Sequence, residues 1–273
     1  MDWTLMRAAL IHLLVLFPVA GMANGEEPVI SLRADNWYPI NGDPAAPRPG
    51  FAIEVLHEIW GAAGYRIDYA LKSWSTSLAQ ARAGEIDCVV GAYIADAPDL
   101  LFPDEYLIVD QLRFYVRYDT EWEYTGPGSL GSDQLRLAII DAYAYGEPVD
   151  GWVAGARPEQ LLIHDGNEAL DENLRAVITG DATALVDSVL VMSARLENAE
   201  IAQRIREAGV IEDRHAVYVA CSPEREESRE YLRLFDEGMR AMRASGRLAE
   251  ILARYAIPAT FAEHDPVRQG AAE

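Results

Sequence analysis

The chain has 273 residues, of which 50% are hydrophobic and 25% are charged, a composition typical of a folded globular protein. Its 44 acidic and 23 basic residues give a formal net charge of -21, so nucleic acids would be repelled and we expect no nucleic-acid partner. The length allows one large domain or two lobes with separate cores. The acidity would suit a cationic ligand, although solubility alone also explains it.

The N-terminal segment has the pattern of a secretion signal. An apolar run over 8–20 follows Arg7 and leads to small residues that end at Ala23. The run is shorter than a membrane span and contains Pro18. We therefore predict a cleavable signal peptide over 1–23 and a periplasmic protein, with an uncleaved membrane anchor as the alternative.

The two cysteines, Cys88 and Cys221, lie in or near predicted strands. Export implies an oxidising compartment in which they could pair. The sequence leaves open a disulfide bond and two buried thiols. Two cysteines without a nearby histidine cluster do not form a zinc site, and we expect neither a metal nor another cofactor.

Strand-like and helix-like segments alternate in the first half of the mature chain. In chain order we predict a strand over 29–34, a helix over 52–63, a strand over 65–71, a helix over 75–83 and a strand over 86–92. Gly64 and Gly84 end the two helices. This order predicts a mostly parallel sheet with helices on its faces.

The second half repeats the alternation and ends in helices. We predict strands over 112–118, 135–140, 161–164, 183–186 and 216–221, helices over 143–154 and 168–179, and helical sequence from 187 to 208. A loop is expected over 119–133. Ser222 is a candidate cap for a long final helix, which Gly246 breaks before a shorter helix that ends near Tyr255.

The order and spacing of these segments resemble the type II periplasmic binding proteins, which are the family 3 extracellular solute-binding proteins of amino-acid ABC importers. The matching stretches lie within 29–257 and include Trp37-Tyr38-Pro39, Pro49-Gly50-Phe51, Ala83-Gly84-Glu85-Ile86-Asp87, Phe102-Pro103, Val186-Asp187 and Ala216-Val217-Tyr218-Val219-Ala220.

The resemblance implies a two-lobed α/β fold of the periplasmic-binding-protein type II class. Each lobe would be a mostly parallel sheet flanked by helices. Lobe 1 would comprise 29–110 and 219–260, lobe 2 would comprise 114–216, and two strands would form the hinge. Residues 261–273 would form a flexible tail.

Candidate ligand-binding residues follow the predicted strands, because ligands of open α/β sheets bind at the carboxyl ends of strands. Asp35, Trp37 and Tyr38 follow the first strand. The carboxylate could accept hydrogen bonds from an amine and the rings could stack on a cationic group, or these residues could cap a turn and pack. Gly91 would allow close backbone approach, and Tyr93 could offer its ring or hydroxyl to a ligand or pack at the strand end.

Lobe 2 supplies three further candidates. Asp141 and Tyr143 follow its first strand and open a predicted helix, whose amino terminus could attract an anion. The resemblance implies that Asp187 binds a ligand ammonium group, with capping of the next helix as the other possible role. Trp74, from lobe 1, could line the cleft or belong to the core.

One departure from the family pattern concerns the ligand. Amino-acid binders of the family carry an arginine shortly after the third strand, which clamps the substrate carboxylate. Here the stretch 94–99 contains no arginine, and Arg113 and Arg117 could replace it only with another geometry. This departure favours a cationic or neutral amine over an ordinary α-amino acid.

The predicted function is the capture of a small polar solute, amino-acid-like or a cationic or neutral amine, for the membrane permease of an ABC importer. We expect a monomer and not an enzyme. The histidines are scattered along the chain and no known nucleophile or zinc-hydrolase motif occurs, so we expect no catalytic residues. The alternatives are a dehydratase-like enzyme on the same fold and a ligand-sensing module for a membrane receptor.

Overall fold

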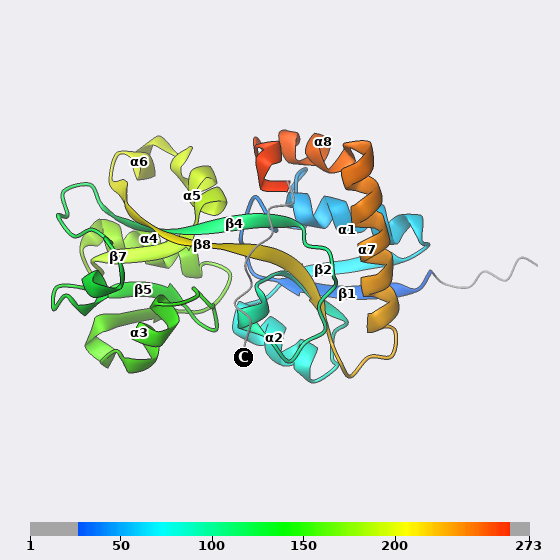
Figure 1. Cartoon of the computed structure of the whole chain (residues 1–273), viewed down its shortest axis with the longest axis horizontal. Coiled ribbons are helices and arrows are strands. Elements are labelled where there is room, and N and C mark those ends of the chain that lie inside the picture. Colours follow the sequence, from blue (N-terminus) through cyan, green and yellow to red (C-terminus); the bar gives the residue numbers. More distant parts are fainter. Residues whose placement is uncertain (1–26, 263–273) are drawn as a thin grey trace, which may run out of the picture.

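The computed structural model describes residues 27–262, so the predicted signal peptide and residues 263–273 of the predicted tail lie outside the described residues. Two α/β lobes are joined by two long strands, β4 (Ile108–Arg117) and β8 (Ile205–Cys221), which run side by side between them (Figure 1). The prediction of a two-lobed α/β fold is confirmed. Within 27–262, no helix is both long enough and apolar enough to cross a membrane.

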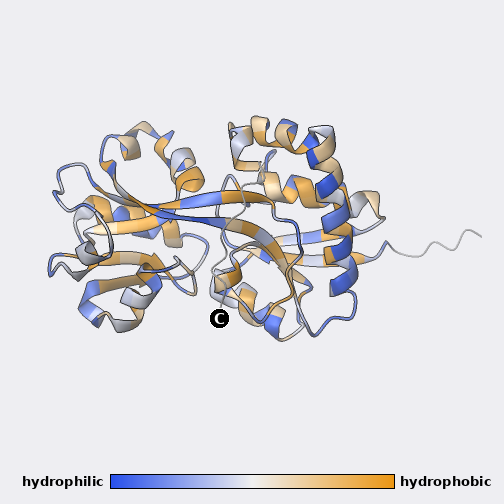
Figure 2. Ribbon diagram, in the orientation of Figure 1, coloured by the Kyte–Doolittle hydropathy of each residue, from blue (hydrophilic) through white to orange (hydrophobic). Residues whose placement is uncertain are grey.

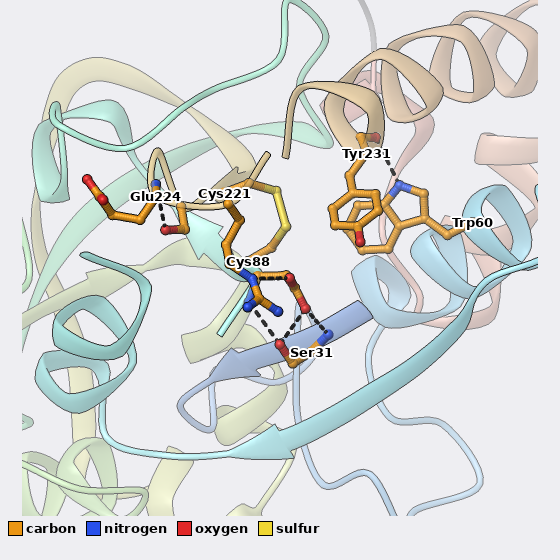
Figure 3. The surroundings of a disulfide bond; sticks show 9 residues. Ser31, Trp60, Cys88, Cys221, Glu224 and Tyr231 are labelled. Carbon is orange, nitrogen blue, oxygen red and sulfur yellow. Dashed lines mark hydrogen bonds and ion pairs between the residues drawn. A yellow bond between two sulfur atoms is a disulfide. The ribbon is translucent and has the colours of Figure 1, made fainter. Parts of the chain in front are cut away.

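Lobe 1 contains both ends of the described chain. Its elements are β1 (Val29–Ala34), α1 (Phe51–Ala62), β2 (Arg66–Leu71), α2 (Trp74–Arg82), β3 (Cys88–Ala92), α7 (Ser228–Ser245) and α8 (Arg247–Arg254). The apolar positions of α1 recur at helical spacing and are buried, and the Trp60 indole donates a hydrogen bond to the Tyr231 carbonyl of α7 at 3.0 Å (Figure 3). A short 3-10 turn, Ala259–Ala262, packs on this lobe through Phe261 and Ala262.

Lobe 2 is the middle of the chain. Its elements are β5 (Leu137–Ile140), α3 (Val149–Gly155), β6 (Leu161–His164), α4 (Ala169–Thr179), β7 (Ala184–Ser188), α5 (Val189–Leu196) and α6 (Ala199–Ala202). The helix α4 ends at Gly180, whose φ of 87° is the left-handed conformation that a glycine C-cap adopts.

The strands form an eight-stranded sheet in the order β2-β1-β3-β8-β4-β7-β5-β6. β1 pairs in parallel with β2 and β3, β5 pairs in parallel with β6 and β7, and β8 is antiparallel to both β3 and β4. Hydrophobic residues dominate the strands inside each lobe, whereas β8 is hydrophilic where it crosses between the lobes (Figure 2). This arrangement directs the carboxyl ends of β1 and β7 toward the space between the lobes, where Trp37, which follows β1, meets Asp187 near the end of β7.

A disulfide bond joins Cys88 of β3 to Cys221 at the end of β8 (Figure 3). The two residues are register partners with Cα atoms 4.0 Å apart, and both side chains are fully buried. The structure thus decides between the two alternatives that the sequence left open. The bond fixes the C-terminal end of one hinge strand to lobe 1.

The predicted helix over 143–154 is wrong in its first half. The helix α3 begins only at Val149, because Ala142 and Gly146 have φ angles of 61° and 74° that interrupt helical geometry. The backbone after β5 therefore forms a turn, and the helix amino terminus expected at Asp141 and Tyr143 does not exist.

Two boundaries near β8 also differ from the sequence prediction. Residues 205–208 were expected in a helix but belong to β8, where Ile205, Ala208 and Ile211 are buried at a spacing of three. Irregularities in the pairing with β4 produce this spacing, which imitates a helix. Ser222 accepts a hydrogen bond from the Glu224 backbone N–H at 3.1 Å, but the helix α7 starts later, at Ser228.

Candidate functional site

A small cavity between the lobes is the centre of the candidate site. It is lined by Asp35, Trp37, Trp74, Gly91, Tyr93, Asp96 and Tyr143, which include six of the nine predicted binding residues. Its volume is about 10 Å³, close to the minimum for one water molecule. The side chains of the two lobes are thus in contact across the cleft.

Carboxylates and uncharged donors hold the lobes together. The Trp37 indole N–H donates to Asp187 Oδ1 at 2.8 Å, and the Tyr143 hydroxyl donates to Asp35. The backbone N–H of Ala144 donates to Asp96 Oδ1 at 2.7 Å. Each of these bonds joins one lobe to the other, so cleft closure depends on aspartates that have no basic partner in these contacts.

The loop after β1 is built around Gly91. The φ of Gly91 is 91°, and a Cβ there would lie 2.6 Å from Asn41 Oδ1, so a larger residue would clash. The Asn41 side-chain N–H donates to the Asp35 carbonyl at 2.8 Å, which orders the turn that carries Asp35 and Trp37. Gly91, which was predicted to allow close approach of a ligand, allows the close approach of the Asn41 side chain.

Four aromatic rings surround the cavity. Trp37 lies edge-to-face with Tyr93 and Tyr143, with ring centroids 5.8 Å and 6.3 Å away. Trp74 makes a similar contact with Tyr143 at 6.3 Å. Trp74 is 3% exposed and belongs to a core cluster while it also lines the cavity, and its indole N–H is buried without a hydrogen-bond partner.

Burial raises the pKa of the cleft carboxyl groups. Desolvation raises the pKa of Asp35 to about 7, although its hydrogen bond from Tyr143 acts in the opposite direction. Desolvation likewise raises the pKa of Asp96 to about 7 and that of Asp187 to about 6. These groups would therefore carry protons for part of the physiological pH range.

Asp110 is a further buried carboxyl group near the cleft, and the sequence did not indicate it. It lies in β4 and accepts a hydrogen bond from the Tyr93 hydroxyl at 3.0 Å. Burial raises its pKa to about 7. Asp110 thus extends the row of acidic groups from the cleft into the hinge.

Among the described residues that line the cavity, none is basic. Arg113 and Arg117, the possible substitutes for the missing arginine, form ion pairs with Glu207 and Asp119, each at 2.5 Å. Arg195 lowers the pKa of Asp187 through its charge, but its closest acidic partner is Asp171, at 3.5 Å.

The structure places the remaining predicted residues as follows. Asp187 is 1% exposed, and Ser188 caps α5 in its place by accepting from the N–H groups of Leu190 and Val191. Tyr38 packs on Tyr255 with ring centroids 6.0 Å apart, and Asp141 is exposed. Tyr38, Asp141 and Asp187 do not line the cavity, although Asp187 contacts the lining residue Trp37.

Asp96 is a lining residue that the sequence reasoning missed. It follows β3 closely and accepts a hydrogen bond from the Tyr93 backbone N–H at 2.7 Å, which gives the chain a tight turn there. An acidic residue three positions after a strand-end tyrosine was the available signal.

Comparison with known proteins gives a consistent picture. The family model described as bacterial extracellular solute-binding proteins, family 3, matches residues 34–258. No curated protein sequence matches the chain significantly.

Solved structures with the same fold share little sequence with this chain. A histidine kinase sensor domain with similarity to periplasmic binding proteins has a TM-score of 0.68 and 15% identity over 84% of this chain and 95% of that one. The substrate-binding protein of an amino acid ABC transporter has a TM-score of 0.65 and 14% identity over 83% and 98%. The ancestral amino acid-binding protein AncCDT-1, a precursor of cyclohexadienyl dehydratase, has a TM-score of 0.66 and 13% identity over 83% and 94%.

Proposed function

This chain belongs to the bacterial extracellular solute-binding proteins, family 3, and on that premise we propose that it captures a small polar solute with an amino group and delivers it to the membrane permease of an ABC importer. One observation carries the proposal. Asp35 and Trp37 of lobe 1 meet Tyr143 and Asp187 of lobe 2 at one buried site. Acidic acceptors and aromatic rings at such a junction suit an amine.

The proposed mechanism is hinge closure on the solute. Opening about β4 and β8 would separate Trp37 from Asp187 and Tyr143 from Asp35. A solute amine would then take acceptor positions that Trp37 and Tyr143 use in the closed arrangement. Because the closed cavity holds only about 10 Å³, the solute must also displace the Tyr143 ring or hold the lobes further apart.

A thermal-shift screen of the mature chain tests the proposal. The compounds would be amino acids, amines, dipeptides and small carboxylates, and a ligand should raise the melting temperature in proportion to the logarithm of its concentration above Kd. Asp187→Asn and Trp37→Phe should abolish the rise. Asp141→Asn is the matched control, because Asp141 is exposed and outside the cavity. The proposal fails if no compound shifts the melting temperature, or if the Asp187 variant responds like the control.

Experiments with the same ligand distinguish transport from sensing and from catalysis. Deletion of the gene should slow growth on micromolar ligand as the sole nitrogen source. Unchanged growth with loss of a ligand-dependent transcriptional response would instead support a sensing module. Recovery of unaltered ligand after incubation with excess protein would support binding, and a product of elimination would support an enzyme.

A further inference from the structure

The charges in the cleft favour a narrower class of ligand than amines in general. Asp35, Asp96 and Asp187 are acidic groups of the closed lobe junction, and their observed partners there are an indole, a phenol and backbone N–H groups. Asp165 is a further acidic group of the junction and accepts a hydrogen bond from the Ser75 hydroxyl at 3.0 Å. Asp187 is 1% exposed, and its Oδ2 has no hydrogen-bond partner. Acceptors are therefore in excess among the described residues that line the cleft, and none of these residues carries a positive charge that would neutralise a ligand anion.

The basic side chains near the cleft do not supply that group. His215 lies against the Tyr93 ring with ring centroids 5.0 Å apart, but burial lowers its pKa and favours the neutral imidazole. Arg113 is paired with Glu207, and Arg195 lies closest to Asp171. Lys72 follows β2, near Asp35 in the chain's fold, but it is exposed and does not line the cavity. The buried Trp74 indole N–H is an unused donor, but a single uncharged donor is a weak partner for a carboxylate.

Resting on the proposed binding role, we infer that the cleft selects an organic cation that carries one or two ammonium groups and no carboxylate. It binds this cation in preference to the amino acid that has the same ammonium groups. One ammonium would replace the Tyr143 hydroxyl at Asp35, and Trp37, Trp74 and Tyr93 would offer ring faces to its alkyl chain and charge. A second ammonium would reach Asp96, which lies on the same cavity.

A ligand carboxylate would face like charges in a poorly hydrated site. At a separation of about 5 Å, repulsion from one ionised aspartate weakens binding on the order of a hundredfold. The mature chain should therefore bind 1,4-diaminobutane, 1,5-diaminopentane or agmatine on the order of a hundredfold more tightly than ornithine, lysine or arginine, which differ from them only by the carboxylate.

Titration calorimetry of these three matched pairs at pH 7.5 tests the inference. Asp35→Asn and Asp96→Asn should weaken binding of the preferred amine at least tenfold, whereas Asp141→Asn should leave it unchanged. The inference is overturned if an amino acid binds as tightly as its decarboxylated partner, or if the two cleft variants bind the amine like the control.

The wider thermal-shift screen separates this inference from the proposed function. If only amino compounds with no net positive charge bind, such as neutral or anionic amino acids, the inferred ligand class is wrong and the proposed function stands. If no compound binds, both are overturned.

Discussion

Two buried aspartates at opposite ends of the lobe 1 sheet have different partners. Asp87, just before β3, accepts from the Ser31 backbone N–H at 2.8 Å and pairs with Arg225 at 2.9 Å. Asp35, just after β1, has the Tyr143 hydroxyl of the other lobe as its side-chain partner, and burial raises its pKa to about 7. The chain thus supplies its own cation where an acid supports the fold, and only uncharged, removable donors where an acid faces the cleft.

The largest expected effect concerns the disulfide next to Asp87. Replacing both Cys88 and Cys221 with alanine should lower the free energy of unfolding by about 4 kcal/mol, because the bond closes a long loop in the unfolded chain. Urea denaturation of the oxidised parent and the variant measures this. Amine binding should survive at a temperature where the variant is folded, since the bond lies at the structural end of the sheet. Loss of binding by the folded variant would contradict that separation.

The aspartates themselves give a sharper contrast. Asp87→Asn should lower the free energy of unfolding by about 2 kcal/mol, because it weakens the hydrogen bonds that the buried carboxylate accepts from Ser31 and its ion pair with the exposed Arg225. Asp35→Asn should cost less than about 1 kcal/mol at pH 7.5, because an amide replaces a carboxyl group that is costly to ionise. Chemical denaturation of both variants provides the measurement. Equal losses of unfolding free energy would show that the charges of Asp87 and Asp35 are stabilised by their surroundings to the same extent.

The fold was largely predictable because apolar periodicity and glycine stops mark the elements of each lobe. Asp35 and Trp37 were found because the end of a parallel strand is a local feature of the sequence. Asp110 could not be found in this way, since only the fold brings the Tyr93 hydroxyl to the start of β4. Three-residue spacing in the irregular part of β8 led to the false helix, because pairing with β4 decides that spacing.

The pH dependence of stability further distinguishes the cleft end of the lobe 1 sheet from the end that carries Asp87. Asp35, Asp96 and Asp110 have folded pKa values of about 7, above the ordinary value of 3.8, so the folded chain binds more protons than the unfolded chain. Their stabilising contribution is complete below about pH 4 and is lost as the pH rises through about 7.

Between pH 6.5 and pH 8, each such carboxyl should cost about 1 kcal/mol, unless the lobes open and hydrate it first. Burial lowers the pKa of His215, which works in the opposite direction but acts below its ordinary pKa of 6.5. Melting curves and small-angle scattering at both pH values measure the loss of stability and any increase in radius of gyration. Asp35→Asn should reduce the loss of stability between the two pH values. If the variant loses as much stability as the parent, the raised pKa of Asp35 is not the cause.

A small effect is also expected for the hydroxyl group that joins the lobes. Tyr143→Phe keeps the ring contacts with Trp37 and Trp74 but removes the hydrogen bond to Asp35. Closure should weaken by about 1 kcal/mol, and the amine should bind equally well or more tightly because it no longer competes with the hydroxyl. Small-angle scattering measures the weaker closure, and titration calorimetry measures the amine affinity. A large loss of amine affinity would show that the hydroxyl binds the ligand directly.

Proton release on amine binding tests the central claim most directly. At pH 6.5, titration calorimetry of 1,4-diaminobutane in buffers with different ionisation enthalpies gives the number of protons released per ligand bound. Because the cation stabilises ionised Asp35, Asp96 and Asp187, the account predicts release of about one proton or more, reduced in Asp35→Asn. Binding of this amine with no proton release would mean that the cleft acids are already ionised and compensated, and would contradict the account.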